Sequence, residues 1–320
     1  MSSLSFNEAD ALFGSILGGD VSDAEIADTL ITMAERGETA EEIAGAAKAM
    51  RARMIRVKAP LGAIDVCGTG GDGSHSFNIS TAVAIVIAAC EIAVAKHGNR
   101  AASSKAGAAD TLEALGLNLD RASQTAEATL SDLGIAFLFA QTHHPALARI
   151  APIRKSLGRR TIFNLIGPLA NPAGVTGQLI GVPTPVRIKS YADALRLLGC
   201  ERAIIVSGAE GLDEISISGP TKCATIGFEL AFDTITPEQF GLPRHPPEAL
   251  RGGDAAFNAA ALSRLLLGET GAYRDAVLIN AGAALIVAGH APTIGEGIEE
   301  AAEAIDKGLA KALLECWIGY

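Results

Sequence analysis

The sequence has few aromatic residues and no long uninterrupted apolar run. Aromatic residues make up 4% of the 320 positions, with one Trp, whereas apolar residues make up 49%. This composition disfavours an aromatic-rich β-sandwich and favours alanine-rich α/β packing. The longest apolar run, residues 82–90, ends before Glu91 and falls short of the roughly 20 residues of a membrane-spanning helix. We therefore expect a buried helix there, and no membrane partner.

Positive charge and closely spaced cysteines are also lacking. The 26 Lys and Arg residues are outnumbered by 36 Asp and Glu, a net charge of −10, which disfavours nucleic acid as a partner. The five cysteines are odd in number and form no C-x-x-C pair, so we expect neither a disulfide framework nor a zinc site. The first thirty residues have no basic segment typical of a signal peptide. We expect a cytoplasmic protein in which a local cationic pocket holds any anionic ligand.

The first sixty residues have helical patterns only. Three capping boxes of the S/T-x-x-E type begin at Ser5, Ser22 and Thr39, and glycines at 18–19 and 37 stand where the helices should end. Three short helices cannot enclose a core alone. We therefore expect them to pack on a partner helix or on a second subunit.

After residue 60, short apolar runs alternate with alanine-rich helical stretches. The predicted strands are residues 63–67, 92–95, 135–140, 179–182, 203–206 and 225–228. This alternation predicts a mostly parallel sheet with helices on its faces, and such sheets bind ligands beyond the carboxyl ends of their strands. Residues 154–172, rich in Arg, Gly and Pro, are interpreted as a crossing between domains.

A glycine-rich segment, residues 68–81, follows the first predicted strand and leads into a helix. Glycines and a helix N-terminus can surround a phosphate with backbone N–H groups. A Walker A loop is excluded because Ser74 stands where Lys is needed. Gly68, Gly70, Gly73 and Glu91 formally match the dinucleotide motif, but the predicted helix begins too late for it. We favour a phosphate or pyrophosphate site over a merely tight turn.

Two further clusters indicate ligand chemistry. Lys-His-Gly-Asn-Arg at 96–100 follows the second predicted strand, and two serines and Lys105 follow at 103–105; the alternative is a solvated charged loop. Asp213 and Glu214 offer the oxygen ligands that Mg²⁺ prefers, the alternative being an exposed acidic turn. Neighbours on a strand point to opposite faces, so both carboxylates can reach one site only from a loop.

These motifs resemble those of the anthranilate phosphoribosyltransferase family. The resemblance rests on Gly-Thr-Gly-Gly-Asp at 68–72, Asn-Ile-Ser-Thr at 78–81 and Lys-His-Gly-Asn-Arg at 96–100. Further agreement, in the family's order, comes from residues 109–116, 143–145, 160–164, 167–172 and 211–214.

The resemblance implies an α/β fold with a small all-helical domain beside a larger domain built on a mostly parallel sheet. The helical domain would comprise residues 1–60 and a returning segment at about 145–172, and the α/β domain residues 61–144 and 173–320. The implied reaction transfers the phosphoribosyl group of phosphoribosyl pyrophosphate to the amine of anthranilate, in tryptophan biosynthesis. Mg²⁺, as two ions, and a homodimer formed through the helical domain are also implied.

The resemblance also implies the site residues. Anthranilate would contact Gly68, Asn99 and Arg154, and Mg²⁺ would contact Ser80, Asp213 and Glu214. The implied donor-binding residues are Gly68, Gly71, Asp72, Ser76, Asn78, Ile79, Ser80, Thr81, Lys96, His97, Gly98, Asn99, Arg100, Ser103, Ser104 and Ala108.

Two positions depart from the family's pattern. Ser76 stands where Thr is usual, and Ala108 where a Ser commonly contacts the ribose phosphate. An aromatic amine needs no strong base, so positioning should carry much of the catalysis. We therefore expect His97, His143 and His144 to line the acceptor channel, and Asp110 and Glu113 to be structural.

Two other classes of function remain as alternatives. A non-catalytic relative that binds nucleic acid should have a basic surface and should have lost the Gly-Thr-Gly-Gly-Asp or Asp-Glu motif. In this sequence the net charge is −10 and both motifs are intact. Another enzyme, a pyrimidine nucleoside phosphorylase or a nicotinamide-dependent oxidoreductase, would share the glycine-rich segment. A phosphorylase should lack Lys-His-Gly-Asn-Arg together with Arg154, and an oxidoreductase should bind NAD.

Overall fold

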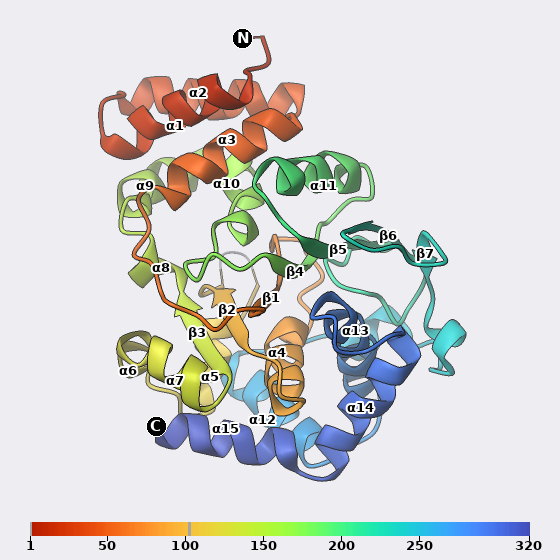
Figure 1. The fold of residues 1–320 in the computed structure, drawn as a ribbon. Helices are drawn as coiled ribbons and strands as arrows, with labels where there is room; N and C mark the ends of the chain where they lie inside the picture. Colours follow the sequence, from red (N-terminus) through yellow and green to blue (C-terminus); the bar gives the residue numbers. More distant parts are fainter. Residues whose placement is uncertain (1, 102–103) are drawn as a thin grey trace.

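A computed structural model describes residues 2–101 and 104–320. Three N-terminal helices, α1 (Phe6–Gly18), α2 (Asp23–Arg36) and α3 (Ala40–Arg51), form a layer at the top of the molecule in Figure 1. Each begins at its predicted capping box, where the hydroxyl of Ser5, Ser22 or Thr39 accepts the N–H of the glutamate three residues later. Gly19 and Gly37, with φ of 97° and 87°, end the first two helices. Local sequence alone therefore sets these helix boundaries.

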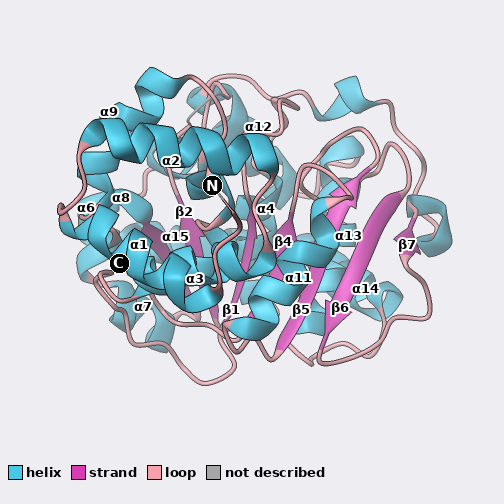
Figure 2. Ribbon diagram, turned by 90° about the horizontal axis from the view of Figure 1, so that it is seen from above, coloured by secondary structure: helices cyan, strands magenta, loops and turns pink. Residues whose placement is uncertain are grey.

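A seven-stranded sheet forms the centre of the molecule, in the order β3-β2-β1-β4-β5-β6-β7 (Figure 2). Neighbouring strands from β3 to β5 in this order are parallel to one another. β6 pairs antiparallel with β5, and β7 pairs antiparallel with β6. The predicted mostly parallel sheet is confirmed. The strands are β1 (Ile64–Gly68), β2 (Val94–Gly98), β3 (Ile135–Phe139), β4 (Gly177–Gly181), β5 (Arg202–Gly208), β6 (Thr221–Ile226) and β7 (Thr234–Ile235).

Two predicted strands were wrong in extent. The predicted strand at 225–228 is centred too late, because β6 pairs with β5 from Thr221 to Ile226 and begins with two polar residues, Thr221 and Lys222. The predicted strand at 92–95 lies too early at both ends, because β2 begins at Val94 and continues through Lys96 and His97, both buried. Polar residues at the end of a strand do not extend its apolar run, so the run alone does not fix where the strand begins and ends.

Helices cover both faces of the sheet. On one face, α4 (Ile79–Ala89) and α13 (Ala272–Val287) contact the strands, with α12 (Ala255–Leu266), α14 (Ile294–Asp306) and α15 (Leu309–Gly319) outside them. On the other face, α11 (Arg187–Leu197) contacts β5, β6 and α3. Side chains along β5 alternate between the two faces. Ile204 and Val206 belong to the apolar cluster that includes α4 and α13, and Ile205 belongs to the cluster that includes α11.

Short elements complete the chain. They are α5 (Ala108–Ala114), α6 (Leu119–Gln124), α7 (Ala126–Asp132), α8 (Ala140–His143), α9 (Leu147–Leu157) and α10 (Ile162–Leu165), with 3₁₀ helices at Pro168–Ala170, Pro237–Phe240 and Pro247–Leu250. The apolar run at 82–90 lies in buried α4 and its C-cap residue Cys90, as predicted. Within the described residues, no helix combines the length and the hydropathy that crossing a bilayer requires.

The N-terminal helices find their packing partners within the chain. Phe13 contacts Phe163 edge-on, with ring centroids 5.8 Å apart, and α3 packs against α11. One apolar cluster joins α1–α3 to Ile180 and Ile205 on the sheet. The expected need for a partner helix is therefore met by α9, α10 and α11 of the same chain.

The order of the strands creates a switch point between β1 and β4. The chain continues from β1 to β2 on one side of β1, whereas β4 lies on the other side. Gly68 at the end of β1 is in register with Gly181 at the end of β4. Ligands of open parallel sheets bind where connections diverge in this way. The loop after β1, residues 69–78, begins at this point and is called the glycine loop below.

Candidate active site

Asp213 lies over the switch point. It belongs to the loop between β5 and β6, residues 209–220, called the carboxylate loop below. Its Oδ2 accepts the N–H of Gly70 at 2.7 Å. A Cβ atom on Gly181 would stand 1.5 Å from the Asp213 carbonyl oxygen, so only glycine fits at the end of β4. The two loops therefore meet above the paired ends of β1 and β4.

Asp213 and Glu214 are buried, with exposed fractions of 9% and 8%. Both lie in a loop, as the predicted shared site requires, and the alternative of an exposed acidic turn is wrong. Burial raises the pKa of both carboxyls, and the nearby Asp72 carboxylate raises them further. The ammonium of Lys96 and the N–H of Ser80 oppose this rise at Glu214. Ionised carboxylates packed this closely repel one another, and a bound cation would stabilise them.

The oxygen donors at this place suit a hard divalent cation. The carboxylates of Asp213 and Glu214 and the Ser80 hydroxyl are the ligand types that Mg²⁺ prefers. Across residues 2–101 and 104–320, no group of three or more His, Cys, Asp or Glu residues could hold a metal alone. Mg²⁺ often completes its coordination with substrate phosphates and waters. The donor set therefore fits a metal shared with a phosphorylated ligand.

Lys96 places a positive charge close to Glu214. Its side chain is buried in β2, and Nζ donates to the Val66 carbonyl at 2.8 Å. The next residue, His97, donates its N–H to the buried carboxylate of Asp65 at 3.1 Å. Asn171 donates to the other Asp65 oxygen at 2.8 Å. The cationic segment predicted as a loop therefore begins inside a strand, where neighbouring polar groups make its burial possible.

The glycine loop has a conformation that depends on glycine and on a distant arginine. Gly70, Gly71 and Gly73 have φ between 65° and 80°, in the left-handed region that glycine favours. Arg160 donates from Nη1 to the carbonyls of Gly70 at 2.8 Å and Gly71 at 2.6 Å. The sequence patterns indicated no role for Arg160, although it begins the family motif at 160–164 and lies in the arginine-rich segment 154–172.

The start of α4 brings several predicted donor-binding residues to the end of the glycine loop. Asn78 is the N-cap residue, and Ile79, Ser80 and Thr81 form the first turn. Thr81 is buried, and its hydroxyl has no hydrogen-bond partner within the described part of the chain. N–H groups in the first turn of a helix have no intrahelical acceptors. The first turn of α4 therefore presents hydrogen-bond donors beside the carboxylates.

The segment after β2 is braced by acidic groups. The Arg100 guanidinium pairs with Asp110 at 2.9 Å and with Glu113, and lies over the Phe139 ring. Asp110 also accepts the N–H groups of Ala101 and Gly107, which agrees with its predicted structural role. Asn99 and Ser104 are exposed, and Ser103 lies outside the described residues. Ala108, half-buried, is the first residue of α5.

Three histidines are buried near the inter-domain segment. The rings of His97 and His144 lie 5.1 Å apart, and His97 Nδ1 is 3.1 Å from the Gly167 carbonyl. Burial lowers the pKa of His97 to about 3 and that of His144 to about 4. His143 contacts the Ile55 carbonyl through Nδ1. All three rings are neutral at neutral pH, which suits them to line an aromatic pocket.

Arg154, the predicted acceptor-binding arginine, lies on α9. It is half-buried and lies 5.7 Å from the centre of the Phe163 ring. The same segment contacts the glycine loop through Arg160. The structure thus joins the segment carrying the predicted acceptor-binding arginine to the predicted donor loop.

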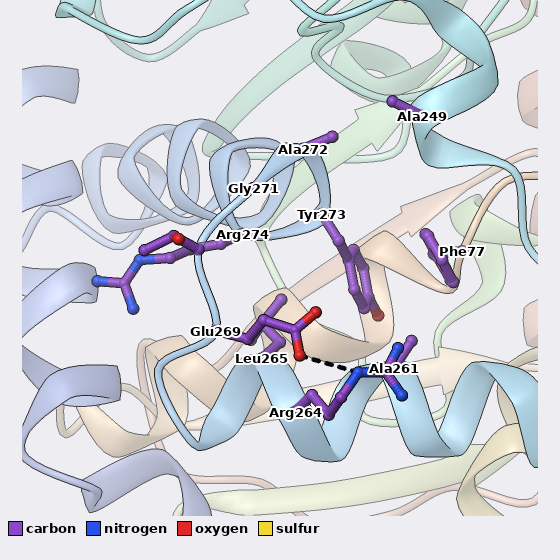
Figure 3. Close-up of a pocket in the computed structure, with 11 residues that line it drawn as sticks. Phe77, Ala249, Ala261, Arg264, Leu265, Glu269, Gly271, Ala272, Tyr273 and Arg274 are labelled. Atoms are coloured by element: carbon purple, nitrogen blue, oxygen red, sulfur yellow. Dashed lines mark ion pairs between the residues drawn. The ribbon is translucent and has the colours of Figure 1, made fainter.

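Residues from the C-terminal half also support the site. Tyr273 stacks on Phe77 with ring centroids 4.5 Å apart, beside a cavity of about 200 Å³ that both rings help to line (Figure 3). Asn258 contacts Asn78, and buried Asn280 contacts both the N–H and the carbonyl of Ile215, next to Glu214. The sequence patterns indicated no role for Tyr273, Asn258 or Asn280, because no motif near them in the chain predicts contact with the site loops.

The dinucleotide-binding alternative does not fit this geometry. Glu91 is exposed in the turn before β2, at the opposite end of that strand from Gly98. The acidic residue of that motif must instead stand near the carboxyl ends of the strands. In addition, α4 begins at Ile79, well after the glycines.

Comparison with known proteins identifies the family. A model of the glycosyl transferase family helical bundle domain matches residues 2–54, and a model of the a/b domain of that family matches residues 61–311. The anthranilate phosphoribosyltransferase of Novosphingobium aromaticivorans is 63% identical, covering 97% of this chain and 94% of that protein. The chain belongs to the anthranilate phosphoribosyltransferase family.

Solved structures of the family agree with the fold described above. Anthranilate phosphoribosyltransferase from Thermus thermophilus superposes with a TM-score of 0.94 at 42% identity, covering 99% of this chain and 96% of that one. The enzyme from Saccharomyces cerevisiae, in complex with PRPP and Mg, superposes with a TM-score of 0.89 at 30% identity, covering 99% and 93%.

Proposed function

We propose that this chain transfers the phosphoribosyl group of phosphoribosyl pyrophosphate to the amine of anthranilate. The products would be N-(5-phosphoribosyl)anthranilate and pyrophosphate, in the second step of tryptophan biosynthesis from chorismate. The observation that carries the proposal is the buried Asp213 carboxylate held against the glycine loop at the switch point. Membership of the family and the PRPP and Mg of the yeast relative support it.

The glycine loop, the start of α4 and the segment after β2 would hold the donor. The N–H groups of the loop and of the helix start, with Lys96, would contact the anionic pyrophosphate. Arg100 would act mainly by shaping the segment, since its guanidinium is paired with carboxylates. The proposed donor-binding residues are Gly68, Gly71, Asp72, Ser76, Asn78, Ile79, Ser80, Thr81, Lys96, His97, Gly98, Asn99, Arg100, Ser103, Ser104 and Ala108.

Ser80, Asp213 and Glu214 would hold Mg²⁺ together with oxygens of the donor, two ions being proposed. When bound, the metal would neutralise negative charge on pyrophosphate. The buried, mutually repelling carboxylates support this assignment, because a divalent cation removes the cost of ionising them. The protein would hold the side chains of Ser80, Asp213 and Glu214 together at the end of the glycine loop.

The remaining side chains would position the acceptor. Arg154 would face the carboxylate of anthranilate, with Gly68 and Asn99 beside the amine. Positive charge develops on the ribose as its bond to pyrophosphate breaks, and the neutral amine then attacks without a strong base. The buried, neutral histidines support a channel for an aromatic ring rather than a proton relay.

We further propose the domain division predicted from the sequence, with residues 1–60 and about 145–172 helical, and 61–144 and 173–320 α/β. The packing of α1 and α2 on α9 supports it. A homodimer through the helical domain and a cytoplasmic location are proposed from family membership. Five free cysteines agree with a reducing compartment. Light scattering of the purified protein tests the dimer.

The function is tested by the loss of anthranilate fluorescence on mixing with phosphoribosyl pyrophosphate, with and without Mg²⁺. We expect Mg²⁺-dependent loss in the wild type and none in Arg154→Ala or Asp213→Ala. Arg149→Ala is the matched control, because Arg149 lies on the same helix but contacts Val21 and Asp23 at the surface. No loss in the wild type, with donor binding still seen by calorimetry, would mean that the acceptor is wrong.

A further inference from the structure

The side-chain amide of Asn78 is almost fully engaged by the protein. Its Oδ1 accepts hydrogen bonds from the Thr111 hydroxyl and from Asn258 Nδ2, the latter at 2.9 Å. Its Nδ2 donates to the Ala106 carbonyl at 3.3 Å. An amide nitrogen has two hydrogens. One N–H of Asn78 is therefore left without an acceptor among the residues that the structure describes.

Main-chain groups at both ends set the direction of this chain of amides. The N–H of Gly253 can only donate, and it donates to Asn258 Oδ1 at 2.8 Å. Asn258 must therefore present its Nδ2 to Asn78, which must present its Oδ1 in return. At the other end, the Ala106 carbonyl can only accept. The Thr111 hydroxyl does not set the direction, because it can donate or accept.

Asn258 belongs to a segment that lies along the glycine loop. The N–H of Gly252 donates to the His75 carbonyl at 2.8 Å, and the N–H of Phe77 donates to the Leu250 carbonyl at 2.9 Å. Asn258 is buried at the start of α12, with 2% of its surface exposed. The segment and the loop thus form one hydrogen-bonded unit in which Asn258 is held rigidly.

We propose that Asn258 is a positioning residue for the phosphoribosyl donor, which orients the amide of Asn78 so that its remaining N–H faces the pyrophosphate. Without Asn258, the 3.3 Å hydrogen bond to the Ala106 carbonyl is the main-chain contact left to orient the Asn78 amide. A flipped amide would turn its oxygen toward an anionic ligand. The inference rests on the proposed assignment of Asn78 to the donor site. It extends that site to α12, a helix that supplies none of the proposed donor-binding residues.

The test compares Asn258→Asp, Asn78→Ala and the double variant by steady-state kinetics. In N258D a carboxylate oxygen replaces the amide nitrogen that faces Asn78 Oδ1. The Asn78 amide then meets an acceptor with its oxygen in either orientation, at the new carboxylate as it stands or at the Ala106 carbonyl if it flips, so its fixed orientation is lost. We expect the KM for the donor to rise about tenfold, as for a lost hydrogen bond to a charged ligand. The KM for anthranilate should be unchanged. Asn258→Ala, which adds no charge, is measured in parallel so that failure of N258D to fold still leaves a test.

Ser263→Ala is the matched control, because Ser263 also lies on α12 and donates to the Ala259 carbonyl on that helix. Its donor KM should equal that of the wild type. In the Asn78→Ala background, N258D should add less than about twofold to the donor KM, because its effect passes through Asn78. A full additional effect there, or no effect of either Asn258 variant alone, would overturn the inference. An unchanged donor KM in Asn78→Ala itself would instead overturn the assignment of Asn78.

Discussion

A Cβ atom on Gly68 would stand 2.3 Å from Asp213 Oδ2. These two residues are far apart in the chain, and their contact brings the glycine loop to the carboxylate loop. The absence of a side chain at Gly68 is thus a condition for the buried carboxylate to reach the Gly70 N–H. The position of the Asp213 carboxylate in the site therefore depends on its close contact with Gly68.

Gly68→Ala should abolish activity and lower the free energy of unfolding by about 2 kcal/mol, because the added methyl displaces Asp213. Gly295→Ala is the control: Gly295 lies on α14, and a Cβ atom there would stand 3.9 Å from its nearest neighbour, Thr293 Oγ1. Urea unfolding and the fluorescence assay measure both effects. Wild-type activity in Gly68→Ala would show that Asp213 can move without loss.

Asp213→Asn should raise the stability of the metal-free protein while lowering kcat/KM by about a hundredfold. The folded protein raises the pKa of Asp213, so the ionised carboxylate costs stability above its unfolded pKa. The gain should therefore grow with pH above about 4 and vanish below it. Thermal unfolding at pH 4 and pH 8 without Mg²⁺ measures it; a variant less stable at pH 8 would contradict the expectation.

The buried His97 should make the protein less stable in mild acid. Its folded pKa of about 3 lies below the ordinary value of 6.5, so only the unfolded chain binds this proton between those values. Stability should fall as pH drops below 6.5, by up to about 1.4 kcal/mol per pH unit from this histidine. His97→Gln should reduce the slope between pH 6.5 and pH 5 in urea unfolding. An unchanged slope would assign the acid sensitivity to other groups.

Arg160→Ala should raise the donor KM about tenfold with a smaller change in kcat, because the glycine loop loses two hydrogen bonds that hold its carbonyls. Its neighbour Arg159 is the control, since it pairs with the exposed Glu35 instead. Arg159→Ala should leave both constants unchanged. Equal effects of the two substitutions would indicate that net charge, rather than the loop contact, matters.

Ala108→Ser should lower the donor KM several-fold, since a hydroxyl at the start of α5 adds one hydrogen bond worth about 0.5–1.5 kcal/mol. Ala114, exposed near the other end of this helix, supplies the control variant Ala114→Ser. Calorimetric titration with the donor measures the affinity directly. Equal affinity in Ala108→Ser and the wild type would refute the expectation.

Sequence by itself determined the features that depend on neighbouring residues. The capping boxes at Ser5, Ser22 and Thr39 set three helix starts, because each bond joins residues three apart. Alternating apolar runs predicted the mostly parallel sheet, and the motifs around Gly68 and Lys96 indicated the family. Local patterns suffice wherever the interaction itself is local.

Tertiary structure alone decided which distant groups meet. The place of Asp213 beside Gly68, of Arg160 on the Gly70 carbonyl and of Asn258 on Asn78 follows from the order of strands and the packing of α12. The continuation of β2 through Lys96 and His97 likewise depends on the partners Val66 and Asp65 on β1. No short-range pattern encodes such contacts, because their energy arises only when segments remote in the chain are folded together.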